Sequence, residues 1–320
     1  DSLQANNTAV NDVYIKNCTF TENVAPAGGA ISALQYVGNS KLTIVESNFT
    51  DNKAFAGGAI YFDDLSYVEI SGTEFTSNEA NNGGAIYALG DLTVKDSTFD
   101  DNNASEDGGA IYASAKYTDV DVVINGSTFT DNKAGDSGGA VAVFETGSYD
   151  LTYAIDDCEF DSNVVTPADR DTCVAGGAFY TEGTTVGTIT NSEFIGNEAD
   201  SDYYANGGAV KVQFGGVATI ENTTFTDNQA AQNGGAISVQ ANTGENCEVF
   251  VINCTFESND APAGGAISLL QNVGKSILVV EDSTFTDNEA FAGGAIYFDV
   301  LSYVEISGTD FISNEANNGG

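Results

Sequence analysis

The chain has 320 residues, of which 47 are Asp or Glu and only nine are Lys or Arg, so its net charge is −38. A chain this acidic repels phosphate and anionic lipid, which argues against nucleic-acid binding and membrane-surface binding, and no stretch approaches the ~18 apolar residues of a membrane helix. The sequence contains no His, and this absence removes the commonest general base and transition-metal ligand.

A three-part motif recurs along the whole chain. Each copy has a Phe, an Asn three residues later, and then a Gly-Gly pair. Successive Phe residues lie 24 to 34 positions apart, so we expect loops of variable length around a constant motif. The Phe residues are Phe20, Phe49, Phe75, Phe99, Phe129, Phe160, Phe194, Phe225, Phe256, Phe285 and Phe311.

The first predicted strand of each copy ends in an Ile or Val five residues before the Phe, and a small residue lies two before it. Residues two apart share a strand face, whereas residues five apart do not. Since both the Ile and the Phe are regularly apolar, we expect a corner between them. Polar turn formers such as Asn17, Glu46 and Asn222 suit that corner.

The last predicted strand follows the Gly-Gly pair, where Ala and an alternating segment such as Ile60-Tyr61-Phe62 recur. Three short strands with corners between them predict one coil of a parallel β-helix. We therefore expect an all-β solenoid of about eleven coils over residues 1–320. Its coils would be stacked ~4.8 Å apart, with ladders of Phe, Ile or Val, and Asn.

The motif resembles the repeat of the chlamydial polymorphic outer membrane protein family. Phe49-Thr50-Asp51-Asn52 followed by Gly57-Gly58-Ala59-Ile60 is similar to one copy of that repeat, and eleven copies span the chain. The resemblance implies a right-handed β-helix of the pectate-lyase-like group. Proteins of this kind are usually secreted or at the cell surface, and they are often adhesins.

A longer period is superimposed on the coils. Residues 18–84 recur at 254–320 with 51 of 67 positions identical, an offset of 236 residues or eight coils. Recent duplication would explain this, and so would a surface that must recur at fixed intervals. The chain begins and ends within coils, so we expect an excerpt of a longer array; the alternative is a unit that stacks end to end.

The recurring Asn and Gly residues each allow two interpretations. The Asn residues could form a binding row, but an internal ladder of amide hydrogen bonds fits an invariant polar slot better. The Gly pairs could cradle phosphate, but they lack the spacing of known phosphate loops and a following helix, so tight corners or close backbone approach are expected.

Cysteine is rare, with five residues in the chain. Cys18, Cys158 and Cys254 occupy the small inward slot, where we expect packed free thiols. The alternative is disulfide bonding within a coil, for which the candidate pairs are Cys158–Cys173 and Cys247–Cys254.

Acidic residues recur two positions after the Phe. Stacked carboxylates would repel one another, and Ca²⁺ could bind between them through oxygen ligands. The alternative is a solvated acidic face, and we predict no other cofactor. The weak Ca²⁺ candidates are Asp51, Asp101, Asp131, Asp227 and Asp287.

Tyrosines follow the apolar residue of the last strand in several coils. They could form a contact stripe between rods or a sugar-stacking row, or they could pair across the sheet. These residues are Tyr61, Tyr87, Tyr112, Tyr180 and Tyr297.

Several Asn-x-Ser/Thr sequons are present, and some fall at predicted outward corners. N-glycosylation is a candidate modification there. The sequon residues are Asn6, Asn17, Asn48, Asn103, Asn125, Asn222 and Asn253.

Enzymatic function is disfavoured. Polysaccharide lyases with this fold need a basic residue beside a carboxylate–Ca²⁺ cluster, and only Arg170 in the insertion 164–175 is available. The sequence therefore predicts a rigid extracellular rod within a filament, appendage or surface coat, with itself or other structural proteins as partner. The alternative is an adhesin stalk that binds host or glycan; a polysaccharide-active enzyme is a remote third possibility.

Overall fold

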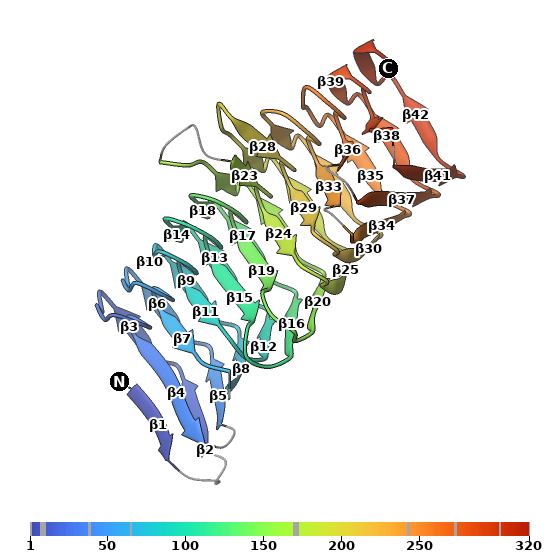
Figure 1. Ribbon diagram of the computed structural model, residues 1–320. Helices are drawn as coiled ribbons and strands as arrows, with labels where there is room; N and C mark the ends of the chain where they lie inside the picture. The colour runs from blue at the N-terminus through green and yellow to red at the C-terminus, as the bar shows by residue number, and fades with distance from the viewer. Residues whose placement is uncertain are drawn as a thin grey trace.

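The protein is a rod of stacked coils (Figure 1). The computed structural model describes residues 2–6, 11–37, 40–64, 66–168, 173–241, 244–271, 274–300 and 302–319. Over these ranges the regular structure consists of β-strands, all paired in parallel, and the two termini lie at opposite ends of the rod (Figure 1). Among the same residues, no helix is long and apolar enough to cross a membrane. The prediction of an all-β parallel solenoid is confirmed, with about ten turns.

Three eleven-stranded sheets, here called A, B and C, form the walls of the rod, and each coil passes through B, then C, then A. Sheet A contains β1 (Ser2–Asn6), β4 (Ile31–Val37), β7 (Ile60–Phe62), β11 (Ile86–Ala88), β15 (Ile111–Ala115), β19 (Val141–Glu145), β24 (Phe179–Glu182), β29 (Val210–Gln213), β33 (Ile237–Ala241), β36 (Ile267–Gln271) and β40 (Ile296–Phe298). Sheet B contains β2 (Asn11–Lys16), β5 (Ser40–Val45), β8 (Ser66–Ser71), β12 (Leu92–Lys95), β16 (Val120–Asn125), β20 (Leu151–Asp156), β25 (Val186–Thr190), β30 (Val217–Glu221), β34 (Asn246–Ile252), β37 (Lys275–Glu281) and β41 (Tyr303–Ser307). Sheet C contains β3 (Thr19–Thr21), β6 (Asn48–Thr50), β9 (Glu74–Thr76), β13 (Thr98–Asp100), β17 (Thr128–Thr130), β21 (Glu159–Asp161), β26 (Glu193–Ile195), β31 (Thr224–Thr226), β35 (Thr255–Glu257), β38 (Thr284–Thr286) and β42 (Asp310–Ile312).

A fourth, short strand lies between sheets C and A, so the prediction of three strands per coil was incomplete. Its second residue is an inward Ala in most coils, such as Ala80 and Ala104, and this small side chain lets the wall close between two corners. Six of these strands form sheet D: β10 (Glu79–Ala80), β14 (Asn103–Ala104), β18 (Lys133–Ala134), β22 (Val164–Val165), β27 (Glu198–Ala199) and β32 (Gln229–Ala230). Two further pairs lie along the same edge: β23 (Cys173–Ala175) with β28 (Tyr204–Asn206), and β39 (Glu289–Ala292) with β43 (Glu315–Asn318).

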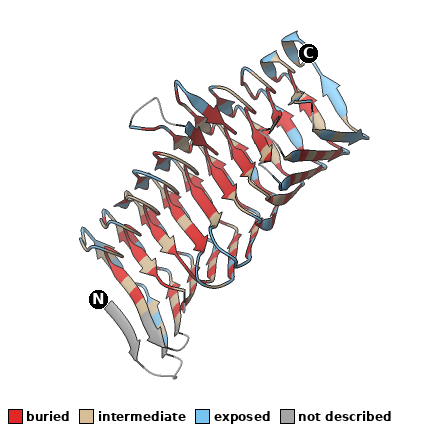
Figure 2. Cartoon of the chain, viewed as in Figure 1, coloured by how far each residue is buried: buried red, intermediate tan, exposed pale blue. Residues whose placement is uncertain are grey.

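The core is a column of like residues in register. Phe99 pairs with Phe75 on one side and with Phe129 on the other, and Val94 pairs with Ile70 and Ile124. All eleven motif Phe rings stack, with centroid separations of 4.6 to 5.0 Å between neighbours. Figure 2 shows the buried residues along the strands of the middle coils, with exposed residues on the loops and in the last coils. The predicted Phe ladder is confirmed.

Corners form where the backbone enters the left-handed region. The predicted B-to-C corner is present: Asn17, Glu46 and Asn222 have φ of 52°, 46° and 52°. The C-to-D corner is similar, because the residue two after each Phe has φ between 50° and 59°. Asn, Asp and Gly tolerate this conformation best, which explains the polar residues there.

Candidate functional site

The motif Asn residues form a continuous internal ladder. Asn78 is fully buried, and its Nδ2 donates to Oδ1 of Asn102 at 2.9 Å and to the carbonyl oxygen of Phe49 at 2.9 Å. The backbone N–H of Asn78 also donates to Asn102 Oδ1, at 3.1 Å. The same pattern repeats along the rod, so these amides are saturated and offer nothing to an external ligand. The internal-ladder interpretation is confirmed.

The Gly pairs are sites of close backbone approach. A Cβ on Gly84 would lie 2.0 Å from the carbonyl oxygen of Gly109 in the next coil, and Gly83 has φ of +62°. Only Gly fits either position. The corner interpretation is confirmed, and it leaves no room for a phosphate.

The five Ca²⁺ candidates, Asp51, Asp101, Asp131, Asp227 and Asp287, lie exposed at the C-to-D corners. Ser or Gly occupies the same slot in other coils, for example Ser77, Ser162 and Gly196, and this interrupts the acidic row. Within the described ranges, no three acidic, Cys or His side chains are grouped so that they could hold a metal ion. The left-handed backbone therefore accounts for these residues without a cation.

The two predicted disulfides are wrong, because all five cysteines are free thiols. Cys158 points inward, where its Sγ donates to the carbonyl oxygen of Asp156 at 3.2 Å, whereas Cys173 is exposed on β23. Cys247 and Cys254 are both buried but hydrogen-bond to carbonyl oxygens in different places, Gln240 for Cys247 and Ile252 for Cys254. Burial raises the pKa of Cys158 and of Cys254 to about 11, so both thiols are packed and unreactive, as expected for the small inward slot.

The outward tyrosines pair across sheet A. The rings of Tyr61, Tyr87 and Tyr112 stack with centroids 5.3 and 4.6 Å apart, and the row continues through Phe144 to Tyr180. Both faces of Tyr87 and Tyr112 are covered by neighbouring rings, whereas the row ends against Ser32 beside Tyr61 and Lys211 beside Tyr180. A sugar-stacking row would need free ring faces, and the inner rings offer none. Tyr297 is next to Ser268 and lies outside this stack. Cross-strand pairing is therefore confirmed for four of the five tyrosines.

One coil beyond Tyr180 the same outward slot holds Lys211, whose side chain is completely buried. Its Nζ donates hydrogen bonds of 3.0 Å each to Ser238 Oγ and Gln240 Oε1. No ion pair among the described residues includes it. Burial lowers the pKa of Lys211 from 10.5 to about 7, because desolvation disfavours the charged ammonium.

Further polar groups surround this lysine on sheet A. Gln213 Nε2 donates to Glu182 Oε2 at 3.0 Å and also to the Tyr180 hydroxyl, which donates to Glu182. One coil beyond Ser238, the hydroxyl of Ser268 is buried and has no hydrogen-bond partner among the described residues. A Ser beside a near-neutral Lys has the composition of a nucleophile and base. However, Lys211 and Ser238 are both fully buried, so a substrate has no route to either atom.

Asp107 lies immediately before a Gly-Gly pair and is half-buried. Burial and then the charge of Asp136 raise its pKa to about 7. The sequence did not single out either Asp107 or Lys211. Two features of the sequence could have indicated them. Asp107 is a charged residue directly before a Gly pair, and Lys211 occupies a position that holds an aromatic or small residue in the other coils.

A family model described as the right-handed β-helix region matches residues 2–160 and 140–320. The chain belongs to the right-handed β-helix family. Searches of curated proteins and of solved structures found no match to it. The β-helix does not by itself decide between structural, adhesive and enzymatic roles.

The predicted sequons lie mainly on the outer surface of the β-helix. Asn17, Asn222 and Asn253 are exposed at B-to-C corners, and Asn48 and Asn103 are exposed on strands. Asn125 is half-buried and donates to Asp156 at 3.0 Å. Asn6 lies outside the residues whose side chains are described.

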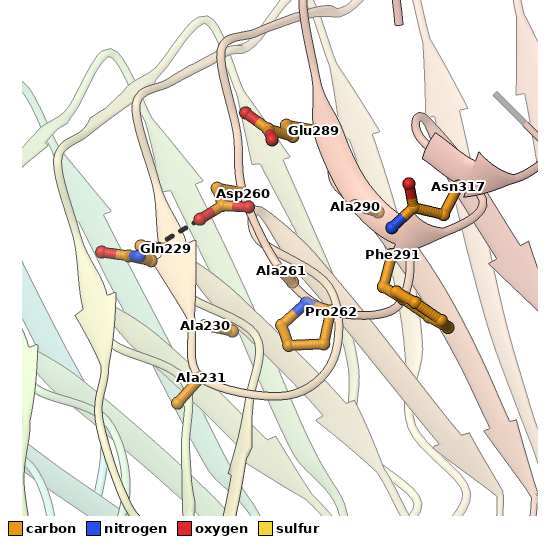
Figure 3. Close-up of a pocket in the computed structure, with 10 residues that line it drawn as sticks. All are labelled: Gln229, Ala230, Ala231, Asp260, Ala261, Pro262, Glu289, Ala290, Phe291 and Asn317. Carbon is orange, nitrogen blue, oxygen red and sulfur yellow. Dashed lines mark hydrogen bonds between the residues drawn. The ribbon is translucent and has the colours of Figure 1, made fainter. Parts of the chain in front are cut away.

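Two hollows lie along the sheet D edge of the β-helix. One, of 390 Å³, is lined by Asp260, Pro262, Glu289 and Phe291 among others (Figure 3). The other, of 380 Å³, is lined by Lys133, Val164 and their neighbours. Both are open depressions between coils, and neither contains the buried Lys211.

Proposed function

We propose that this β-helix is a structural segment of a rigid extracellular rod, forming part of a filament, appendage or surface coat. The unbroken stack of eleven Phe rings carries the proposal. The Asn ladder accompanies it, so every coil is joined to the next through side chains as well as through three or four parallel sheets. Bending or stretching such a rod requires breaking bonds that run along its axis.

We also propose that the repeats are of the polymorphic outer membrane protein type. Each member of the motif contributes separately to the coil, because the Phe stacks, the Asn forms the ladder and the Gly pair makes the corner. The presence of all three members together in every coil supports this assignment. The proposed extracellular location is supported by the family resemblance and by the net charge of −38.

We propose that the chain is not an enzyme. The absence of His removes the usual acid and base, and the one Lys with a pKa near 7 is sealed from solvent. Arg170, the basic residue considered for lyase chemistry, lies outside the described residues.

The partner in this proposal is a second copy of the chain or another structural protein, with glycans as further candidates. Electron microscopy of native material tests it. We expect long rods or filaments with an axial repeat tied to the 236-residue unit, ~38 Å at one strand spacing per coil. Isolated monomers carrying a ligand at one end would overturn the filament and favour an adhesin stalk.

A further inference from the structure

Two large aromatic side chains are exposed at equivalent places on the rod. Phe55 and Phe291 are 66% and 60% exposed, and they are related by the 236-residue offset. Both occupy the third position after the ladder Asn, where every other coil has Pro, Asn, Ser, Gly, Thr, Asp or Ala. Exposed aromatic rings are enriched where proteins meet.

One backbone contact is common to both rings, although Phe291 lies in β39 and Phe55 in a bend between strands. The backbone N–H of Phe55 donates to the carbonyl oxygen of Pro26 at 3.1 Å, and Phe291 donates to Pro262 at the same distance. In Figure 3 the ring of Phe291 borders the hollow that Pro262 also lines. A hydrogen bond to the preceding coil therefore fixes the backbone that carries each exposed ring.

The two patches differ mainly in charge. We define the N-terminal patch as Val24, Pro26, Lys53 and Phe55, and the C-terminal patch as Asp260, Pro262, Glu289 and Phe291. Two of the four positions are identical; Val24 is replaced by Asp260 and Lys53 by Glu289. The Lys53 side chain is 56% exposed and pairs with Glu79 at 2.5 Å. The patches thus have the same apolar centre, with the Lys53–Glu79 ion pair beside one and the carboxylates of Asp260 and Glu289 beside the other.

We propose that the N-terminal patch of one copy of this chain binds the C-terminal patch of a second copy, an inference that rests on the proposed filament. Phe55 and Phe291 would pack against each other, and Lys53 would face Glu289 and Asp260. On a rod with a large excess of exposed carboxylates, this pairing places the Lys53 ammonium against two further carboxylates. An interface between two different patches does not close on itself, so further copies add to either end.

In a parallel arrangement, neighbouring rods are displaced by one 236-residue unit, which is eight coils or ~38 Å. The interval between the patches then equals the stagger between neighbouring rods. This accounts for a duplication that copied exposed residues as well as core residues.

The test uses the whole chain and measures self-association by analytical ultracentrifugation and electron microscopy. We expect Phe55→Ser and Phe291→Ser each to weaken association about tenfold or more. Ala231→Ser, in the same slot of a coil without the aromatic, is the matched control and should associate as the native chain does. Thermal melting should be unchanged in all three variants, because the altered side chains are exposed.

A charge exchange makes the test specific. We expect Lys53→Glu to weaken association and the double variant Lys53→Glu with Glu289→Lys to restore it. If native filaments form but none of these variants changes them, the patch proposal is wrong and the filament stands. If the native chain stays monomeric at high concentration, the patch proposal and a filament built from this chain alone are both overturned.

Discussion

The side-chain amide of Asn163 donates a hydrogen bond of 3.0 Å to the side-chain oxygen of Asn197, one coil further along the rod. Its second amide hydrogen bonds the carbonyl oxygen of Phe129 at 2.9 Å, in the preceding coil. Asn163 therefore joins three successive coils, and its own Oδ1 accepts two bonds from Asn132. Such residues add side-chain hydrogen bonds along the axis to the backbone hydrogen bonds of the sheets.

Replacing Asn163 by Ala should lower the free energy of unfolding by about 2–5 kcal/mol, because two buried donors of Asn132 lose their acceptor. Urea denaturation followed by circular dichroism measures this change. The control is Asn103→Ala, an exposed Asn one residue after a ladder position. Equal effects from the two variants would contradict a stabilising role for the ladder.

Replacing Gly84 by Ala should destabilise the rod by a similar ~2–5 kcal/mol, because the new Cβ would overlap the carbonyl oxygen of Gly109. Gly147→Ala is the matched control, since its nearest neighbour would be 3.4 Å away and its φ is not positive. Melting temperatures of the two variants provide the comparison. A Gly84 variant that melts like the native chain would show that the coils are further apart than described.

Lys211 should make the rod less stable at neutral and acidic pH than at alkaline pH. Its pKa in the folded state, about 7, is below its ordinary value of 10.5. Between these values the unfolded chain binds a proton that the folded chain does not, so this group's contribution to stability rises from pH 7 to 10.5 and is lost as pH falls through 7.

The free energy of unfolding of Lys211→Met should therefore exceed that of the native chain most at pH 6, by up to a few kcal/mol. This difference should shrink towards pH 10. Denaturation at both pH values measures the difference. Exposed Lys116→Met serves as the control. A pH-independent difference for Lys211→Met would mean that the amine is charged throughout.

Asp107 should act in the opposite sense. Its pKa is raised from 3.8 to about 7 in the folded state, so the stability it contributes is full below pH 3.8 and is lost as pH rises through 7. Asp107→Asn should thus raise the melting temperature at pH 8 and have little effect near pH 4. Denaturation at the two pH values measures this, and an effect of Asp107→Asn that is equal at both would contradict it.

Removing divalent cations should leave the melting temperature unchanged. The acidic corner residues are explained by their left-handed backbone, and Asp101 already pairs with Lys133 at 3.1 Å. Melting with and without a chelator, followed by Ca²⁺ addition, is the measurement. A melting temperature that falls with the chelator and recovers with Ca²⁺ would reinstate a cation between the coils.

Much of this architecture could be predicted from the sequence because each coil repeats the same side chains. The five-residue interval between Ile70 and Phe75 requires a corner, and like residues stack only if the coils are in register. The Phe stack, the Asn ladder and the Gly corners follow from such local constraints. The small residue two positions before each Phe shares a strand face with it. This likewise predicts that Cys158 and Cys254, which occupy that position, point inward.

Only the tertiary structure decided the features that depend on residues about 30 positions away. The fourth strand forms because Ala80 and Ala104 meet across coils, although each alone is an ordinary Ala. The residues of adjacent coils bury Lys211 and cover the ring face of Tyr87. Cys158 and Cys173 stay apart because Cys158 faces the core and Cys173 faces the solvent. Sequence periodicity determines which residues share a ladder. The burial and pairing of each residue in the ladder depend on its particular neighbours in the two adjacent coils.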